Sequence, residues 1–564
     1  MRERPQPSLD ADGPRASDRA RRPETPLDGI DALAASAVGL ASFGVYYWTL
    51  APGLLCAASG EFQTLAAVPG YAHPAGSPVY VLLARAASLT PSAEVARSVN
   101  LLSAVMGAAA VGLLYLLGRS LVDRRCVSVA GAAALAVSPA FWSQAIMAGP
   151  HTSAMVFMVA ILLAMSVWQR TGRSRWLLVA ASLAAVSLGV HASVLLMAPA
   201  ALVLLLFTPR RWIVNWPAAI LGTALGLGVV LAAFWWIDRA DSPANYFRAV
   251  IAPSRSVWGL EPEDLDEFHE RVELSLLAPQ YRDSLLSKPP EVVRQKALDY
   301  LENLPREIPP LWLAVSVGGL VWLGRKSWKM TLLLILTLAA HLAFDLCYAT
   351  PDVHLLYIAT YLPVAVFGIA GLALAADLWT AASRRKGPSG HSPAALNATL
   401  GALGLAVVMS PMVFPAAWND EGRRDCWTPP EAEPFQIAYS PAFHGEIRQL
   451  VRDLEDDAVL FTGWSQLYPC YYVAHVEQGR TRMVFIQDYP QPYYFELADS
   501  ALQYVRRTAP TRPVYFTHVV GKVEEQFELK PVRRGRQILY RVGKPIRPAA
   551  SDDPIAKAPP PERS

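Results

Sequence analysis

The stretch Cys56-Ala57-Ala58-Ser59-Gly60-Glu61-Phe62 is followed closely by Tyr71-Ala72-His73-Pro74-Ala75-Gly76-Ser77-Pro78. Both come after the first long apolar segment, Ile30–Leu50. A carboxylate and an imidazole beside a membrane helix are poor packing groups, but they suit acid–base chemistry on a lipid-linked substrate. We therefore predict that Glu61 is catalytic and that His73 binds substrate. The alternatives are that Glu61 only caps the next helix and that His73 is a structural turn residue.

The composition is that of an integral membrane protein. The chain has 564 residues, of which 53% are hydrophobic and only 17% are charged, and its mean hydropathy is +0.25. These values are too apolar for a soluble protein of this length. The net charge of +3 gives no reason to expect a nucleic-acid partner. Residues 1–28 and 545–564 are rich in Pro and charged residues, and both are predicted to be disordered tails.

Eleven apolar segments approach the length that spans a bilayer, and together they predict an α-helical polytopic domain over residues 29–416. Several are short, so re-entrant or half-spanning helices are an alternative. The eleven segments are Ile30–Leu50, Val99–Gly118, Val127–Met147, Thr152–Val167, Trp176–Gly189, Ser193–Phe207, Ile213–Trp236, Pro310–Leu323, Met330–Tyr348, Leu355–Ala375 and Ala394–Ala416.

The basic residues predict the orientation, because Lys and Arg concentrate on the cytoplasmic side. Arginine precedes the first segment, and basic clusters follow the second, fourth, sixth, eighth and tenth. With a cytoplasmic N-terminus and eleven spans, all six clusters are cytoplasmic. Loops 51–98 and 237–308 and the chain beyond residue 416 are then extracytoplasmic. The clusters contain Arg15, Arg19, Arg21, Arg22, Arg119, Arg124, Arg125, Arg170, Arg173, Arg175, Arg210, Arg211, Arg325, Lys326, Lys329, Arg384, Arg385 and Lys386.

The two outer loops are predicted to lie at the membrane surface. Val79–Leu89 is apolar but short, and Arg85 within it favours an interfacial helix over a span. A guanidinium can bind a lipid phosphate bidentately, so we predict that Arg85 binds substrate. Its alternative is snorkelling to a headgroup. The segment Ile237–Ile308 is amphipathic and predicts surface helices, with a merely solvated cover as the alternative.

Residues 417–544 change to a soluble α/β pattern. Short strand-like runs at Ala458–Phe461, Arg482–Ile486, Val514–Phe516 and Ile538–Arg541 predict a small, largely parallel sheet with covering helices. The loop Gly463–Gln466 follows the first strand, where α/β folds place ligand loops; ordinary loop packing is the alternative.

The five cysteines show no metal spacing. Two of them, Cys426 and Cys470, lie in this outer domain, and a bridge between them is compatible with an oxidising compartment.

Several motifs occur together in a recognisable order. The last of these motifs in the chain is Pro351-Asp352, followed by Tyr357, Tyr361 and Pro363. Together they resemble the family of multispanning proteins that includes the transmembrane protein O-mannosyltransferases, in the GT-C glycosyltransferase superfamily. The resemblance covers roughly residues 30–542 and is strongest over residues 49–104. The earlier motifs are Thr49-Leu50-Ala51-Pro52-Gly53, Ser59-Gly60-Glu61-Phe62, His73-Pro74-x-Gly76-x-Pro78-x-Tyr80 and Asn100-Leu101-Leu102-Ser103-Ala104.

The resemblance implies a GT-C fold and a sugar carried on a polyprenyl or dolichyl phosphate. It implies transfer to an acceptor hydroxyl of a protein or glycan, outside the cytoplasm, in a membrane that we expect to be a bacterial inner membrane. Glu61 would be the base or a metal-assisting carboxylate. The chain departs from the family at two positions that are usually acidic, Ala58 and Gly149. These losses weaken the case for a divalent metal, and we expect neither a metal nor another cofactor.

Five more residues lie in predicted outer turns and are expected to bind substrate. His151 and His191 each lie at an outer helix end, where a hydrogen-bonded structural histidine is the alternative. Asp352 and His354 share a tight turn and could instead satisfy its backbone. Tyr357 follows them in the family-like motif.

Two other functional classes stay open. A transporter would need charged residues inside several spans, and Asp345 is the main one here. A catalytically inactive envelope scaffold would explain Ala58 and Gly149.

Overall fold

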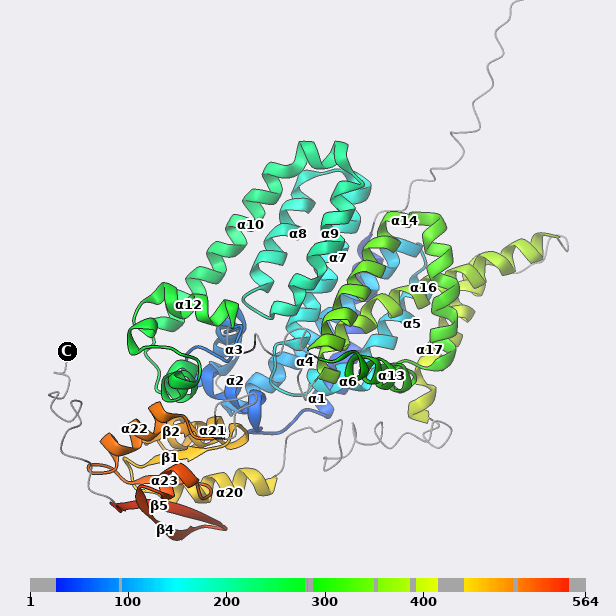
Figure 1. The fold of residues 1–564 in the computed structure, drawn as a ribbon. Helices are drawn as coiled ribbons and strands as arrows, with labels where there is room; N and C mark the ends of the chain where they lie inside the picture. Colours follow the sequence, from blue (N-terminus) through cyan, green and yellow to red (C-terminus); the bar gives the residue numbers. More distant parts are fainter. Residues whose placement is uncertain are drawn as a thin grey trace, which may run out of the picture.

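The computed structural model describes residues 27–90, 94–278, 281, 288–348, 353–385, 392–413, 441–489 and 496–546. A bundle of apolar helices carries a small α/β domain at one end (Figure 1). The predicted tails lie almost wholly outside the described residues, as do Asp352 and Cys426.

All eleven predicted spans fall on helices. Among the described residues, six helices are long and apolar enough to cross a membrane, and a seventh span results if α5 and α6, which are bent by 74° at Val137–Ser138, count as one. The other candidates are shorter apolar helices. The helices are α1 (Gly29–Trp48), α4 (Val95–Val122), α5 (Arg125–Ala136), α6 (Pro139–Ala145), α7 (His151–Thr171), α8 (Ser174–Ser187), η2 (Ala192–Met197), α9 (Ala198–Leu206), α10 (Pro209–Asp238), α14 (Pro310–Cys347), α15 (Val353–Leu356), α16 (Ile358–Arg385) and α17 (Pro393–Val413).

Helix α14 covers two of the predicted spans. A straight helix of its 38 residues would be about 57 Å long, nearly twice the hydrocarbon thickness of a bilayer. The backbone at Ser327 is not helical (φ −150°, ψ 69°), so α14 is two helices joined across a kink. The kink lies between the two predicted segments.

The predicted interfacial segment is α3 (Pro78–Ser88), which follows α2 (Ala57–Ala67). The loop after α10 is largely helical, as predicted. It contains a π-helical turn, η3 (Phe247–Ile251), and the short helices α11 (Ala252–Ser254), η4 (Arg255–Val257) and η5 (Pro262–Leu265). Two longer helices complete it, α12 (Phe268–Leu277) and α13 (Pro290–Glu307).

The C-terminal domain is a five-stranded sheet with the order β2-β1-β3-β5-β4. β1 (Val459–Thr462) pairs in parallel with β2 (Val484–Gln487) and β3 (Val514–Phe516), with Val459 opposite both Val484 and Val514. β4 (Phe527–Arg534) and β5 (Gln537–Pro545) form an antiparallel hairpin beside β3. Helices α20 (Pro441–Arg452), α21 (Trp464–Tyr471), η7 (Tyr472–Glu477), α22 (Asp499–Thr508) and α23 (Gly521–Glu524) complete the domain.

The prediction of a largely parallel sheet was therefore only half right. Strand β4 was missed because its alternating pattern is mostly charged and exposed, with Glu528, Lys530 and Arg533 among its residues. Gly535, with φ +57°, makes the turn to β5. A charged edge strand of this kind discourages pairing with other chains.

The two parts of the molecule share one hydrophobic core. Phe62 and Tyr80, from α2 and α3, pack in the same buried cluster as Leu460, Tyr468 and Cys470 of the C-terminal domain. Cys470 is fully buried there as a free thiol, so the structure does not show the bridge to Cys426 that was predicted for it. The shared core holds the α/β domain against the segment that carries Glu61.

Candidate functional site at the junction of the helix bundle and the C-terminal domain

Glu61 lies in the middle of α2 and its side chain is completely buried. The preceding glycine allows this close packing. A Cβ at Gly60 would come within 2.4 Å of the Leu55 carbonyl oxygen and 3.1 Å of Pro469 Cδ on α21. The sequence therefore folds α2 tightly against the C-terminal domain, with the carboxylate between them.

Both oxygens of Glu61 are engaged by His73. Oε1 accepts a hydrogen bond of 2.7 Å from the backbone N–H of His73, and Oε2 contacts the ring Nδ1. His73 lies in the loop between α2 and α3, and its side chain is 30% exposed, whereas that of Glu61 is not exposed. Because Nδ1 faces the carboxylate, Nε2 is the ring atom left for a ligand.

The pair changes the protonation of His73. Burial alone lowers the pKa of His73, but the charge of Glu61 and the hydrogen bond to it outweigh burial. The net pKa of His73 lies above its ordinary value of 6.5. An imidazole held by a carboxylate, with its other nitrogen free, is the arrangement that orients a general base.

Aromatic rings surround His73 on several sides. Phe62 lies beside it, with ring centroids 5.8 Å apart, and packs edge-to-face on Tyr80 at 4.9 Å. Trp464 of the C-terminal domain meets the His73 ring edge-to-face at 5.8 Å. Trp464 also contacts Tyr246, at 6.2 Å. Aromatic faces of this kind also suit the apolar face of a sugar.

The C-terminal domain contacts the segment around Glu61 directly. The hydroxyl of Thr64 donates a hydrogen bond of 2.9 Å to the carbonyl of Tyr468. Burial raises the pKa of the Tyr468 hydroxyl, and the nearby charge of Glu61 raises it further. The loop Gly463–Gln466, predicted as a ligand loop, thus brings Trp464 to the site.

Two more histidines, His151 and His191, lie near His73. The rings of His151 and His191 are 5.1 Å apart, and His151 is within electrostatic reach of His73 and His354. Burial, and then the neighbouring His73 and His341, lower the pKa of His191 to about 4, so this ring is neutral at neutral pH. His151 and His191 therefore both lie within electrostatic reach of His73, whereas His354 lies near His151 and His341 near His191.

The side chains of Tyr357 and Arg85 both contact other residues of the protein. Tyr357 is buried and packs edge-to-face on Tyr300 of α13 at 4.8 Å. Arg85 donates hydrogen bonds of 3.2 and 3.1 Å to the carbonyls of Ala66 and Ala67, at the C-terminal end of α2. A cation there stabilises the end of the helix that carries Glu61. The binding of substrate by these two residues, and by Asp352, stays a prediction.

The two positions that depart from the family lie near the same place. Ser59, next to Ala58, donates a hydrogen bond of 2.7 Å to the Ala148 carbonyl, and the N–H of Gly149 donates one of 2.9 Å to the Tyr80 hydroxyl. A Cβ at Gly149 would have no neighbour closer than 3.5 Å, so steric crowding does not explain the missing carboxylate. Neither Ala58 nor Gly149 offers a side-chain ligand atom beside Glu61, and the expected absence of a divalent metal at Glu61 stays a prediction.

A buried amide network fixes the loop before α2. Asn100 on α4 donates to the Ala51 carbonyl at 2.8 Å and accepts from Gln63 Nε2 at 2.8 Å and from the Ala148 N–H at 2.9 Å. It therefore ties three segments of the site together. Its place in the family-like motif Asn100–Ala104 was the available signal, but nothing in the local pattern indicated these partners.

Residues that sequence reasoning missed reach the site from distant parts of the chain. Tyr246 comes from the loop after α10 and Tyr468 from α21. His341 lies inside α14, where its ring Nδ1 contacts the Thr337 carbonyl at 2.9 Å. An imidazole within an apolar helix was the signal for His341; Tyr246 and Tyr468 offered none.

Comparisons with known proteins agree with this architecture. The family described as "Protein O-mannosyl-transferase TMEM260 N-terminal domain" matches residues 58–215, which include Glu61, His73, His151 and His191. The fold is similar to the crystal structure of ArnT from Cupriavidus metallidurans in the apo state, with a TM-score of 0.51 and 11% identity, over 90% of this chain and 97% of that one. The predicted resemblance and GT-C fold class are confirmed. The family model thus matches the segment that carries Glu61 and His73, and the structural match shows a shared fold.

Proposed function

We propose that this protein transfers a sugar from a polyprenyl-phosphate donor to an acceptor hydroxyl, with a protein or glycan as acceptor. The observation that carries the proposal is the buried Glu61 carboxylate bound to the half-exposed His73 ring, at the junction of a GT-C helix bundle and its outer domain. The match of the O-mannosyl-transferase family to residues 58–215 supports the reaction class.

In this mechanism His73 acts as the base and Glu61 holds it. The acceptor oxygen attacks the anomeric carbon of the sugar as the bond from that carbon to the phosphate oxygen breaks. The acceptor proton moves to Nε2 of His73, and polyprenyl phosphate leaves with the bonding electron pair. Sequence reasoning gave the base role to Glu61 itself. Because both of its oxygens face His73, we place the proton transfer at His73.

The phosphate is already a good leaving group, so the protein must mainly bind it and align the reactants. We propose that the histidines around His73 line the space for the donor headgroup. His151 and His191 lie side by side there, and neutral imidazole N–H groups donate hydrogen bonds to phosphate oxygens. No metal enters this proposal, since the chemistry proposed for Glu61 and His73 needs none.

We also propose that the site faces away from the cytoplasm. Two contacts support this orientation, because each links a residue of one basic cluster to the helix that leads into another cluster. Arg124 pairs with Asp377 on α16, and Lys329 donates to the Phe207 carbonyl at the end of α9. Four of the six predicted clusters fall wholly within the described residues, and a fifth does so in part. The junctions α7–α8 and α9–α10, which carry two of them, lie at the end of the bundle away from the α/β domain (Figure 1). A periplasm-active reporter fused after Val542 should be active, and a cytoplasm-only reporter should be silent.

One observation favours a second function. The absence of carboxylates at Ala58 and Gly149 is what a catalytically inactive envelope scaffold would show. The preserved Glu61–His73 pair argues against it, because an inactive protein has no need of a buried carboxylate on a half-exposed imidazole.

The deciding experiment is sugar transfer by the full-length protein, purified in detergent, with polyprenyl-phosphate sugars and hydroxyl acceptors. Transfer should occur in wild type and be lost in His73→Ala. Glu302→Gln, an exposed carboxylate change on α13, serves as the matched control and should keep full activity. A wild-type protein that is inactive with every donor tested would favour the scaffold.

A further inference from the structure

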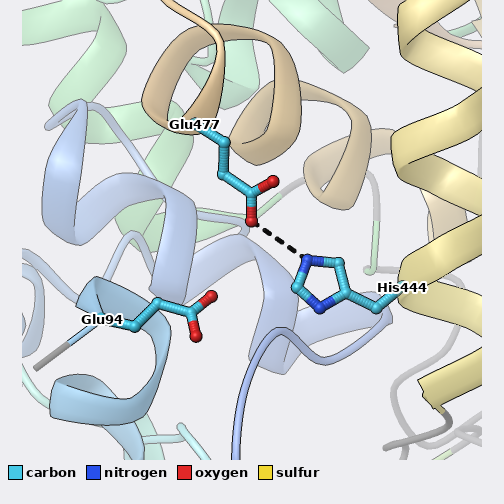
Figure 2. A group of neighbouring side chains, drawn as sticks. All are labelled: Glu94, His444 and Glu477. Carbon is cyan, nitrogen blue, oxygen red and sulfur yellow. Dashed lines mark hydrogen bonds and ion pairs between the residues drawn. The ribbon is translucent and has the colours of Figure 1, made fainter.

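A second cluster of ligand-type side chains lies at a different point of the same domain junction. Glu94 immediately precedes α4 of the helix bundle, His444 lies on α20 and Glu477 ends η7, both in the C-terminal domain. One ligand atom of each lies within 4.8 Å of the others. Figure 2 shows the two carboxylates and the imidazole pointing toward a common space.

The charges of this cluster are unbalanced. Arg448 neutralises Glu477 through a bidentate pair of 2.7 and 2.8 Å, and His444 Nε2 contacts the same carboxylate at 3.1 Å. The carboxylate of Glu94 makes no hydrogen bond or ion pair with any residue that the structure describes. A second negative charge therefore faces the group without a bonded cation.

The imidazole of His444 is positioned as metal-ligand histidines are. The His444 side chain is only 9% exposed, so its ring is held by packing while Nε2 faces the carboxylates. Carboxylate oxygens keep free lone pairs when they accept from Arg, so Glu477 can bind Arg448 and a cation together. The pKa of Glu477 is about 2, since the hydrogen bonds from His444 and Arg448 outweigh the effect of burial.

We propose that Glu94, His444 and Glu477 bind a divalent transition-metal ion of the Zn²⁺ class, which fastens the C-terminal domain to the helix bundle. An imidazole with two carboxylates is a donor set that Zn²⁺ accepts, whereas Ca²⁺ and Mg²⁺ prefer oxygen ligands alone. Zn²⁺ ligands lie about 2.1 Å from the metal, so their atoms are about 3.4 Å apart. The three ligand atoms already lie within 4.8 Å of one another, so the exposed Glu94 side chain has only the small remaining difference to close.

The site would brace the region that carries the Glu61–His73 pair. The backbone N–H of Ala96, two residues after Glu94, donates a hydrogen bond of 3.1 Å to the hydroxyl oxygen of Tyr472, which lies in the same η7 as Glu477. Gln63 of α2 donates to the Ala96 carbonyl at 3.3 Å. A metal at Glu94 therefore adds a third link at this contact. The inference stands independently of the proposed glycosyl transfer.

The test measures Zn²⁺ binding by the full-length protein in detergent, after chelator treatment and dialysis. We expect one Zn²⁺ per chain by calorimetry and elemental analysis, and an X-ray absorption spectrum with one imidazole among oxygen ligands. Glu94→Gln and His444→Gln should each weaken binding by at least about 100-fold, because loss of even an outer-shell partner typically costs 10–100-fold. Glu446→Gln, a control on the same helix, should bind as wild type does.

The controls distinguish the loss of a metal-binding side chain from destabilisation of the fold. Both variants should unfold at the wild-type temperature when metal is absent, and only wild type and Glu446→Gln should be stabilised by added Zn²⁺. A variant that unfolds early is replaced by Glu94→Ala, whose position is exposed and tolerant. Absence of Zn²⁺ binding in wild type, or equal binding in all four proteins, would overturn the proposal.

Discussion

The indole of Trp464 lies edge-to-face against the imidazole of His73, with ring centroids 5.8 Å apart. Trp464 opens α21 in the C-terminal domain, and His73 lies between α2 and α3 in the membrane domain. The C-terminal domain is thus a wall of the proposed site, and the position of the proposed base depends on how the two parts pack.

Replacing Trp464 by alanine should therefore reduce sugar transfer. An aromatic pair contributes about 0.5–1.5 kcal/mol beyond its buried area, so kcat/KM should fall by up to about tenfold. Trp464→Phe should retain most of the rate because it keeps a ring against His73. Trp379→Ala removes an exposed tryptophan from α16 and is the control. Full activity in Trp464→Ala would show that Trp464 does not contribute to sugar transfer.

Removing the charge of Glu61 should have a larger effect. Glu61→Gln keeps the size of the side chain but cannot hold a positively charged His73. General-base catalysis contributes about 10²–10⁴-fold, so the transfer rate should fall by at least ~100-fold. Circular dichroism and the unfolding temperature should show that the variant folds. A folded variant with most of its activity would show that the pair does not take part in proton transfer.

The pH dependence of kcat/KM gives a separate test of the pair. His73 must be neutral to accept a proton, and its pKa in the folded protein lies above 6.5. Activity should therefore rise with pH through a midpoint above 6.5 and then level off. In Glu61→Gln the interactions that raise the pKa are gone and burial lowers it, so the midpoint should move below 6.5.

The same shift has a consequence for stability. A raised folded-state pKa means that the Glu61–His73 pair stabilises the protein fully below pH 6.5 and progressively less as the pH rises through the folded-state pKa. The unfolding temperature difference between wild type and Glu61→Gln should shrink over that range.

The pH profile of activity also has a contrary outcome. Activity that falls as the pH rises would instead indicate that protonated His73 binds the donor phosphate.

The sequence was informative where local pattern determines structure. The apolar runs predicted the helices, and the motif around Glu61 and His73 predicted a catalytic Glu61 and a substrate-binding His73 in one outer loop, without predicting that the two side chains pair. Trp464 and Tyr468 could not be placed on Glu61 in advance, because their position depends on the packing of a shared core between segments far apart in the chain. The sequence placed two segments in α14, on either side of Ser327, but only the backbone at Ser327 shows how these two halves join.

The buried amide of Asn100 should be important for stability. Asn100→Ala would remove two donated hydrogen bonds and leave the buried Ala148 N–H without its acceptor. An unsatisfied buried donor costs about 1–3 kcal/mol, so the free energy of unfolding should fall by about 3 kcal/mol in total. Asn303→Ala, an exposed change on α13, should be near neutral. Equal unfolding temperatures for the two variants would contradict the role of this network.

Arg85 offers two outcomes that can be separated. Its guanidinium donates to the carbonyls of Ala66 and Ala67, so it holds the end of α2. Hydrogen bonds from charged groups contribute about 1.5–3 kcal/mol, and partial exposure reduces this, so Arg85→Ala should lower the free energy of unfolding by about 1–2 kcal/mol. If Arg85 only caps α2, the KM for the lipid donor should stay unchanged once the protein is fully folded. If it also binds the donor phosphate, the KM should rise while kcat changes less. Arg85→Lys keeps one charge and can still reach a carbonyl, but it cannot bind phosphate bidentately. If Arg85→Lys has wild-type stability but a raised KM, Arg85 binds the phosphate. If Arg85→Lys has wild-type stability and a wild-type KM, Arg85 only caps α2.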